Sequence, residues 1–200
     1  MSDERPTPAD LQAKFYQEHL ATRDAIGIPS DCSPCQLLYV PCADTLIAEV
    51  YRRSTPAREH RLFARRHSER RYTPVGQPAD GIHYKQPVAH PDLQCAYFSV
   101  WSTRHFSYEG VGGDWNSIQR LHLSDYRIEQ VVADGELVIP SPYDRSWVSD
   151  LLGISADGAS LICICGLQRH TGERVDYFLC YLDVSSSCVT PLTKLEGTWF

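Results

Sequence analysis

Long apolar runs and export signals are both missing from this chain of 200 residues. No stretch approaches the roughly 18 consecutive apolar residues that suggest a membrane-spanning helix, so we expect a soluble protein without a membrane partner. The first residues, Met1 to Pro6, are acidic and polar and lack the basic-then-apolar order of a secretory signal. We therefore expect a cytoplasmic protein, long enough to form one domain with a buried core.

Recognisable catalytic motifs are missing as well. The segment Gly153-Ile154-Ser155-Ala156-Asp157 lacks the second glycine of a nucleophile elbow, and the glycine-rich loop at Gly110 to Gly113 lacks the following helix of a phosphate cradle. The histidines show no metal-ligand spacing on a common element. Those considered are His83, His90, His105 and His122. These absences favour a protein that is not an enzyme.

The eight cysteines are interpreted mainly as core residues. A reducing cytosol keeps thiols free, and a cysteine in an apolar strand pattern behaves as a small hydrophobic residue. The cysteines that we expect in the core are Cys95, Cys163, Cys165 and Cys180.

A single Cys-x-x-Cys pair, Cys32-Ser33-Pro34-Cys35, has the spacing of a zinc knuckle or a redox pair. Strong zinc signatures carry two such pairs, and this pair is expected in a loop between a helix and a strand. We therefore favour structural cysteines and no cofactor. The alternative is a zinc ion held by Cys32 and Cys35, with Cys42 or distant histidines as further ligands.

The N-terminal residues carry helix signals. Thr7 can cap a helix, Pro8 suits the first helical position, and Leu11 and Phe15 recur at helical spacing. The pattern predicts one amphipathic helix over residues 8–23, followed by a connector rich in Pro and Ser. Residues 1–36 are thus separated from a β region over residues 37–200.

From Leu37 onward, short apolar or alternating runs separated by turn residues indicate β-structure. The strands are predicted at residues 37–40, 45–51, 60–66, 69–75, 95–101, 118–123, 127–132, 136–139, 160–165, 177–184 and 188–192.

Three segments of this region are similar to one another. Residues 41–50, 90–100 and 155–164 each consist of a turn that contains Asp, followed by an apolar strand. Each is followed by a second pair of strand patterns, and the first and third copies end in Thr-Pro. The chain therefore contains about three repeats, at roughly residues 37–80, 81–135 and 136–200.

These repeats resemble the blades of TolB-like β-propellers. The resemblance rests on Ser155-Ala156-Asp157-Gly158 and His90-Pro91-Asp92 before a strand, and on Tyr181-Leu182-Asp183 at a strand end. It implies a mainly β fold of about three four-stranded, antiparallel, blade-like repeats behind a short N-terminal helix. Some TolB-like propellers are metal-using enzymes that act on acidic sugars, and such blades also resemble the gating propellers of prolyl-oligopeptidase-type peptidases.

The number and spacing of the repeats depart from that family. Propellers close with about four to eight blades, whereas the Asp residues that mark the three repeats lie 48 and 65 positions apart. Three arrangements stay open: a partial or degenerate propeller, two copies that complete one another, or a different β stack.

A basic stretch runs from Arg52 to Arg71. It holds eight arginines against two glutamates, in a chain whose net charge is −6. Such a stripe could bind nucleic acid or another acidic partner. The favoured interpretation is that its strands point arginine toward solvent or toward an acidic surface of the same protein. The predicted basic patch consists of Arg61, Arg65, Arg66, Arg70 and Arg71.

Two stretches predicted to be loops contain aromatic and arginine side chains, the usual anchors of protein interfaces. The loop at residues 102–116 contributes Arg104, His105, Phe106, Tyr108 and Trp115, and the loop at residues 140–147 contributes Tyr143, Arg145 and Trp147.

The functional hypothesis is a non-enzymatic protein-binding module on a propeller-like scaffold, with a protein partner or a second copy of the chain. The alternatives are an enzyme or enzyme fragment of the propeller type, and nucleic-acid binding through the stretch from Arg52 to Arg71. A convergent cluster of His, Asp or Glu would favour the enzyme, and affinity that falls steeply with salt would favour nucleic acid.

Overall fold

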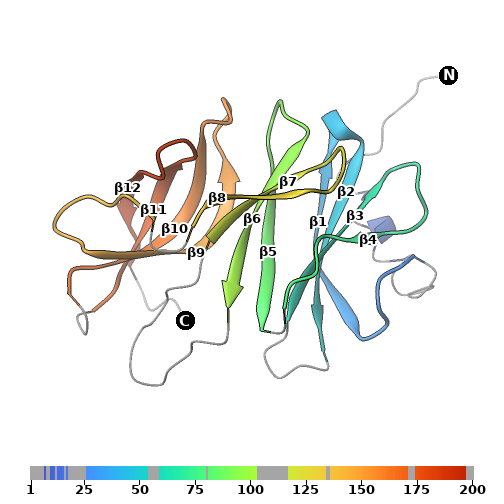
Figure 1. The fold of residues 1–200 in the computed structure, drawn as a ribbon, viewed down its shortest axis with the longest axis horizontal. Helices are drawn as coiled ribbons and strands as arrows, with labels where there is room; N and C mark the ends of the chain where they lie inside the picture. Colours follow the sequence, from blue (N-terminus) through green and yellow to red (C-terminus); the bar gives the residue numbers. More distant parts are fainter. Residues whose placement is uncertain are drawn as a thin grey trace.

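Three four-stranded antiparallel sheets stand side by side in the computed structural model of the chain (Figure 1). The structure describes residues 7, 10–11, 13–15, 17, 26–53, 59–79, 81–102, 117–133, 136–170 and 174–196. Within these residues no helix has both the length and the apolar character needed to cross a membrane. The predicted fold class, a mainly β chain with three blade-like repeats, is confirmed.

The first sheet has the strand order β1-β2-β3-β4. Its strands are β1 (Cys32–Val40), β2 (Thr45–Arg52), β3 (His60–Arg66) and β4 (Thr73–Pro74). β1 begins at Cys32 rather than at Leu37, so Cys32 and Cys35 lie in a strand and not in the expected loop. The pairing with β2 shifts register between Pro34 and Gln36, and this bulge hides the two-residue alternation from which a strand is predicted.

The second sheet has the order β5-β6-β7-β8. Its strands are β5 (Ile82–Ala89), β6 (Cys95–Ser102), β7 (Ser117–His122) and β8 (Ile128–Val132). β5 was not predicted from sequence. Its pairing with β6 is interrupted between Lys85 and Val88, where Gln86 has a left-handed backbone with φ +53°. This irregularity breaks the alternation of apolar and polar residues along the strand.

The third sheet has the order β12-β11-β10-β9. Its strands are β9 (Arg145–Ile154), β10 (Ser160–Gln168), β11 (Asp176–Asp183) and β12 (Val189–Lys194). β9 was not predicted, because two bulges interrupt its pairing with β10. Arg145 and Trp147 consequently lie in a strand and not in the predicted loop. The strand predicted at residues 136–139 is also wrong: only an isolated bridge joins Val138 to Cys188.

The sheets pack face to face around two apolar clusters. Between the first and second sheets lie Ile47, Leu62, Phe98 and Leu121, and between the second and third lie residues such as Leu161. The strand β5 contacts both neighbouring sheets, through β1, β2 and β3 on one side and β9 on the other. The cysteines expected in the core are all buried there: Cys95, Cys163, Cys165 and Cys180.

The N-terminal segment covers the outer face of the first sheet. Residues 10, 11, 13–15 and 17 are helical, and the rest of the predicted helix lies outside the described residues. Thr7 caps the helix, because its Oγ1 accepts a hydrogen bond from the Asp10 amide at 3.2 Å. Phe15 is only 2% exposed and meets the ring of Tyr72 edge-on at 5.8 Å. The cluster around it includes Leu11 and Phe63. One end of the stack is therefore covered.

Two glycines of the third repeat, Gly153 in β9 and Gly158 in the turn before β10, test the packing between sheets. Gly158 has φ +72°, and a Cβ there would lie 2.2 Å from Nε2 of His90. At Gly153 the nearest atom to such a Cβ is Ile162 Cδ1, at 3.9 Å.

We expect Gly158→Ala to lower the free energy of unfolding by about 1–3 kcal/mol, because of backbone strain and the clash with His90. Gly153→Ala should change it by less than about 0.5 kcal/mol. Urea unfolding of both variants measures the difference, and equal effects would contradict this packing.

Candidate functional site

The predicted binding residues separate into three groups. Arg104, His105, Phe106, Tyr108 and Trp115 lie outside the described residues. Tyr143 packs toward the interior, where its ring meets Phe178 edge-on at 5.8 Å and the guanidinium of Arg169 lies 5.9 Å from its centroid. Arg145 and Trp147 lie at the start of β9, opposite Gln168 and Gly166 of β10.

Trp147 lies on the outer face of the third sheet, the face turned away from the second sheet. Its indole covers Gly166 so closely that a Cβ on that glycine would lie 2.5 Å from the ring. The neighbouring Tyr177 meets the indole edge-on at 6.4 Å. The pairing of the strands places Trp147, Gly166 and Tyr177 in one row across the sheet.

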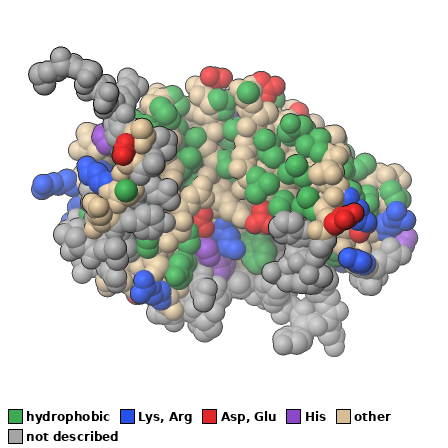
Figure 2. Space-filling model, turned by 180° about the vertical axis from the view of Figure 1, so that it is seen from behind, with side chains coloured by type: hydrophobic (Ala, Val, Ile, Leu, Met, Phe, Trp, Pro, Cys, Tyr) green, Lys and Arg blue, Asp and Glu red, His purple; other side chains and the backbone are tan. Residues whose placement is uncertain are grey.

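Two further rows continue this face. The second row runs Asp150, Ile164, Leu179, Thr193, and the third runs Gly153, Ile162, Tyr181, Thr190. Tyr181 is 40% exposed, and Leu152, at a bulge beside the third row, is 53% exposed. We call the surface formed by these three rows and Leu152 the open face. Figure 2 shows hydrophobic side chains gathered over the third sheet as seen from behind.

The predicted basic patch is divided in the structure. Arg65 is buried, donates to the backbone carbonyls of Glu69 and His67, and lies 4.9 Å from the ring centroid of Tyr72. Arg61 donates to the carboxylate of Glu59 at 2.7 Å and to a backbone carbonyl of β5. Arg66, Arg70 and Arg71 are exposed. Arg61 and Arg65 thus form contacts within the protein.

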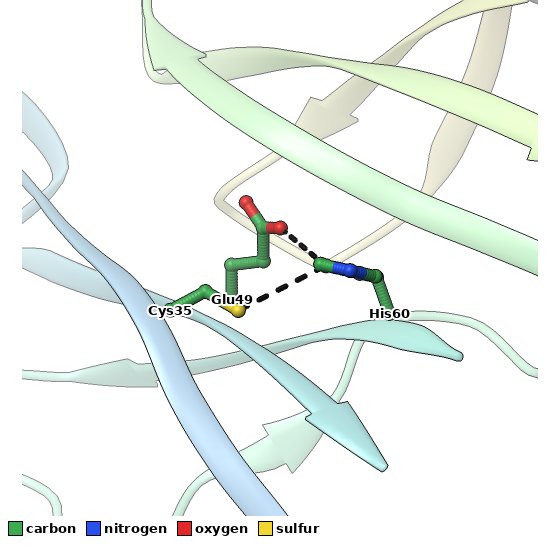
Figure 3. Close-up of side chains that lie close together, drawn as sticks. All are labelled: Cys35, Glu49 and His60. Atoms are coloured by element: carbon green, nitrogen blue, oxygen red, sulfur yellow. Dashed lines mark hydrogen bonds and ion pairs between the residues drawn. The ribbon is translucent and has the colours of Figure 1, made fainter. Parts of the chain in front are cut away.

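A mixed polar cluster lies on the first sheet, on the side that faces the second. Cys35, Glu49 and His60 come from the adjacent strands β1, β2 and β3 and point toward one another (Figure 3). His60 Nδ1 lies 2.7 Å from Glu49 Oε1 and 3.9 Å from Cys35 Sγ. Their three potential ligand atoms all lie within 4.8 Å of one another. We call this group the Cys-Glu-His cluster.

The surroundings of the cluster hold it in place. Glu49, which is 4% exposed, accepts a hydrogen bond on its other oxygen from the backbone amide of Gln86 at 2.8 Å. Nδ1 of His83 accepts one from the backbone amide of His60 at 3.3 Å. Burial raises the pKa of the Cys35 thiol to about 11, aided by Glu49 and opposed by Lys85.

The neighbouring His83 is buried and neutral near pH 7. Burial lowers its pKa to about 4, and the neighbouring Lys85 and His60 act in the same direction. Its Nε2 is a buried atom without a hydrogen-bond partner within the described residues. The ring lies 6.0 Å from that of His60.

The sequence hypothesis of a two-cysteine site does not match this geometry. Cys32 belongs to the apolar cluster beneath the N-terminal segment, and it is not among the residues whose ligand atoms converge. The bulge at Cys35 directs its side chain to Glu49 and His60 instead. Distant histidines were allowed as further ligands, but neither His60 nor Glu49 was singled out from sequence. The register of β1, β2 and β3 brings them to Cys35.

Comparison with known proteins supports the fold. The chain matches no family model and no curated protein. A solved oligogalacturonate lyase from Vibrio parahaemolyticus is similar, with a TM-score of 0.50 and 16% identity over 84% of this chain and 39% of the lyase chain. A GH74 xyloglucanase from Xanthomonas campestris has a TM-score of 0.43 and 12% identity, over 75% of this chain and 19% of that chain. This chain therefore spans about two fifths of the lyase, and it is a mainly β protein whose three four-stranded antiparallel sheets form a propeller-like arrangement.

Proposed function

We propose that this chain is a non-catalytic protein-interaction module that docks through the open face. The observation that carries the proposal is the difference between the two ends of the stack. The outer face of the first sheet is covered by the N-terminal segment, whereas the outer face of the third sheet is apolar and partly exposed within the described residues. Exposed apolar patches of this kind mark interaction sites in proteins.

The sequence of β10 supports the same conclusion. Leu161, Cys163 and Cys165 face the core, and Ile162 and Ile164 between them face outward. An antiparallel strand with one solvated face normally alternates apolar and polar residues, while a strand apolar at every position is typical of one buried on both faces. β10 therefore has the composition of a strand that is covered on its outer side as well. Within the single chain Ile164 is already only 9% exposed, whereas Ile162 is partly exposed.

The partner that we propose is a second copy of the chain. Asp150 is the single charged residue in the three rows, and its carboxylate accepts a hydrogen bond from Gln86. An almost uncharged face can pair with its own copy across a two-fold axis without bringing like charges together. Because the first sheet is already covered, pairing of the two open faces leaves no further face available, and the assembly stops at two copies.

The size of the open face limits how tightly two copies can bind. Four strands about 4.8 Å apart and about seven residues long present a plane of roughly 450 Å² on each copy. Two such planes total roughly 900 Å², below the roughly 1,200–2,000 Å² of standard stable interfaces. We therefore expect a dimer that dissociates on dilution through the micromolar range.

We also propose that the repeats are TolB-like blades. The Asp residues of the repeat pattern act in the turns: Asp157 Oδ1 accepts from Ser155 Oγ at 2.5 Å, and Asp183 Oδ1 accepts from the Ser185 amide at 2.9 Å. Hydrogen bonds from Ser185 and Ser186 lower the pKa of Asp183 to about 2. The cytoplasm stays the proposed compartment, a proposal supported by eight cysteines that form no disulfide with one another.

The docking proposal is tested by charge on the open face. Tyr181→Glu and Thr190→Glu each place a carboxylate in the third row, at side chains that are already exposed. We expect each to weaken self-association at least 100-fold, because two carboxylates would meet near the two-fold axis and lose water. The control is Leu93→Glu, at a residue 52% exposed in the turn between β5 and β6.

Sedimentation velocity over a concentration series measures the association constant. The wild type and Leu93→Glu should dimerise equally, and the two open-face variants should sediment as monomers. A wild type that stays monomeric, or open-face variants that associate as tightly as the wild type, would overturn the proposal of a second copy.

A further inference from the structure

We propose that Cys35, Glu49 and His60 bind a zinc ion. This inference is independent of the proposed docking, since the Cys-Glu-His cluster lies between the first and second sheets and the open face lies on the third. One thiol, one imidazole and one carboxylate are the three ligand types that proteins use for Zn²⁺.

The distances are close to those that zinc requires. Tetrahedral zinc with bonds of about 2.0–2.3 Å holds its ligand atoms roughly 3.3–3.7 Å apart. In the cluster the imidazole nitrogen lies 2.7 Å from the carboxylate oxygen and 3.9 Å from the sulfur. Binding therefore requires the first pair to separate and the second to approach, each by less than about 1 Å, which side-chain rotation alone can supply.

The backbone presents the three ligands from rigid elements. β1, β2 and β3 are hydrogen-bonded neighbours, and the bulge at Cys35 turns its thiol onto the side that carries Glu49 and His60. The amide of Gln86 fixes the Glu49 oxygen that does not contact His60. Partners of this kind orient metal ligands in known sites.

Two observations favour a bound ion over a simple polar bridge. A bridge between Glu49 and His60 does not need a thiol, yet Cys35 is directed to them by an irregularity of the strand. In addition, Nε2 of His83, beside His60, is a buried polar atom that lacks a partner within the described residues. A buried unpaired polar atom costs about 1–3 kcal/mol, so a polar group of the metal site, such as a water on the fourth zinc position, would relieve that cost.

The composition of the cluster also selects the metal. A thiolate ligand disfavours Mg²⁺ and Ca²⁺, which prefer oxygen, and the mixed S, N and O set suits Zn²⁺. On binding, the thiol proton of Cys35 leaves to solvent and the thiolate takes its place on the ion. Cys35 and His60 are half-buried, so the ion can enter from solvent. Three metal-binding side chains would leave a fourth position on the zinc ion for water or for a bound small molecule.

Zinc and cobalt titrations of the full chain test the proposal. We expect the wild type to bind one Zn²⁺, measured by competition with a chromophoric chelator, and to gain thermal stability. Cys35→Ser should weaken zinc binding by about 100-fold or more. Removing a residue that only orients a metal ligand already weakens metal affinity strongly, and removing the ligand itself should cost no less affinity. The control is Cys42→Ser, which removes an exposed thiol outside the cluster and should bind as the wild type does.

A spectroscopic readout separates a true ligand from a structural effect. Co²⁺ bound to the wild type should show a thiolate-to-cobalt charge-transfer band that Cys35→Ser lacks, while His60→Asn should weaken the affinity for both metals. Circular dichroism of the metal-free variants confirms that they fold. Equal zinc affinity in the wild type and Cys35→Ser, or no zinc binding by the wild type, would overturn the proposal.

Discussion

Replacing Gln86 with alanine should lower the free energy of unfolding by about 3 kcal/mol. Gln86 lies in the second sheet, and its side chain ties that sheet to the third. Its backbone amide, which alanine keeps, donates to Glu49 of the first sheet. Its Oε1 accepts from the Leu151 amide at 3.0 Å and from Ser99 Oγ at 3.2 Å, and its Nε2 donates to Asp150 at 2.5 Å. Alanine would leave the amide of the buried Leu151 and the carboxylate of Asp150 without this partner. Urea unfolding followed by tryptophan fluorescence measures the loss.

Two further variants separate the side chain from the backbone at this position. Gln86→Gly relieves the left-handed φ of +53° but loses the same hydrogen bonds, so it should be destabilised slightly less than the alanine variant. Gln86→Glu keeps the acceptor but sets a carboxylate against Asp150, and it should be destabilised as well. An alanine variant as stable as the wild type would show that these contacts do not hold the sheets together.

Replacing Phe15 with alanine should remove about 3–5 kcal/mol of packing from the N-terminal segment. The loss is large because Phe15 is nearly inaccessible and lies against Tyr72. Detachment of the segment would expose the apolar outer face of the first sheet, which includes Leu46 and Phe63. Each chain would then expose an apolar face at both ends of its stack of sheets. The face at one end of a chain could bind the face at the other end of the next chain, and such head-to-tail contacts do not close after two copies. We therefore expect assemblies larger than dimers.

The matched control is Gln17→Ala, an exposed position on the same helix. Light scattering and binding of a hydrophobic dye should rise for Phe15→Ala and stay at the wild-type level for Gln17→Ala. A Phe15 variant with unchanged stability and unchanged mass would show that the segment does not cover the first sheet.

The repeat pattern could be found from sequence because its signals are local. The turns at Asp157 and Asp183 use side-chain hydrogen bonds to residues two or three positions away, and short-range patterns of this kind are visible in a single chain. The apolar strands that follow or precede them mark one blade each. Three four-stranded repeats were therefore predictable.

The strands β5 and β9 were missed for a physical reason. Both carry bulges, at Gln86 in β5 and next to Leu152 in β9, and a bulge shifts which residues face inward. The alternation of apolar and polar residues is lost at these points even though the strand continues. The same irregularity hid the first half of β1, before Leu37, where Cys35 is the residue displaced.

The candidate sites depend on contacts that alternation alone does not reveal. Glu49 lies between the apolar residues Ala48 and Val50 of β2, and His60 lies within the stretch that was interpreted through its arginines. Only strand pairing brings them to Cys35. The open face did leave a signal, because Ile162 and Ile164 make β10 apolar on both sides. That signal indicates a strand with two covered faces, but it does not identify what covers the second.

The absolute mass of the wild-type chain in solution tests the central claim, that one open face per chain pairs two copies. Light scattering on a size-exclusion column, repeated from high to low micromolar concentration, should give a mass that falls from twice the 22.6 kDa chain mass toward 22.6 kDa. A constant mass of 22.6 kDa at every concentration would contradict the claim.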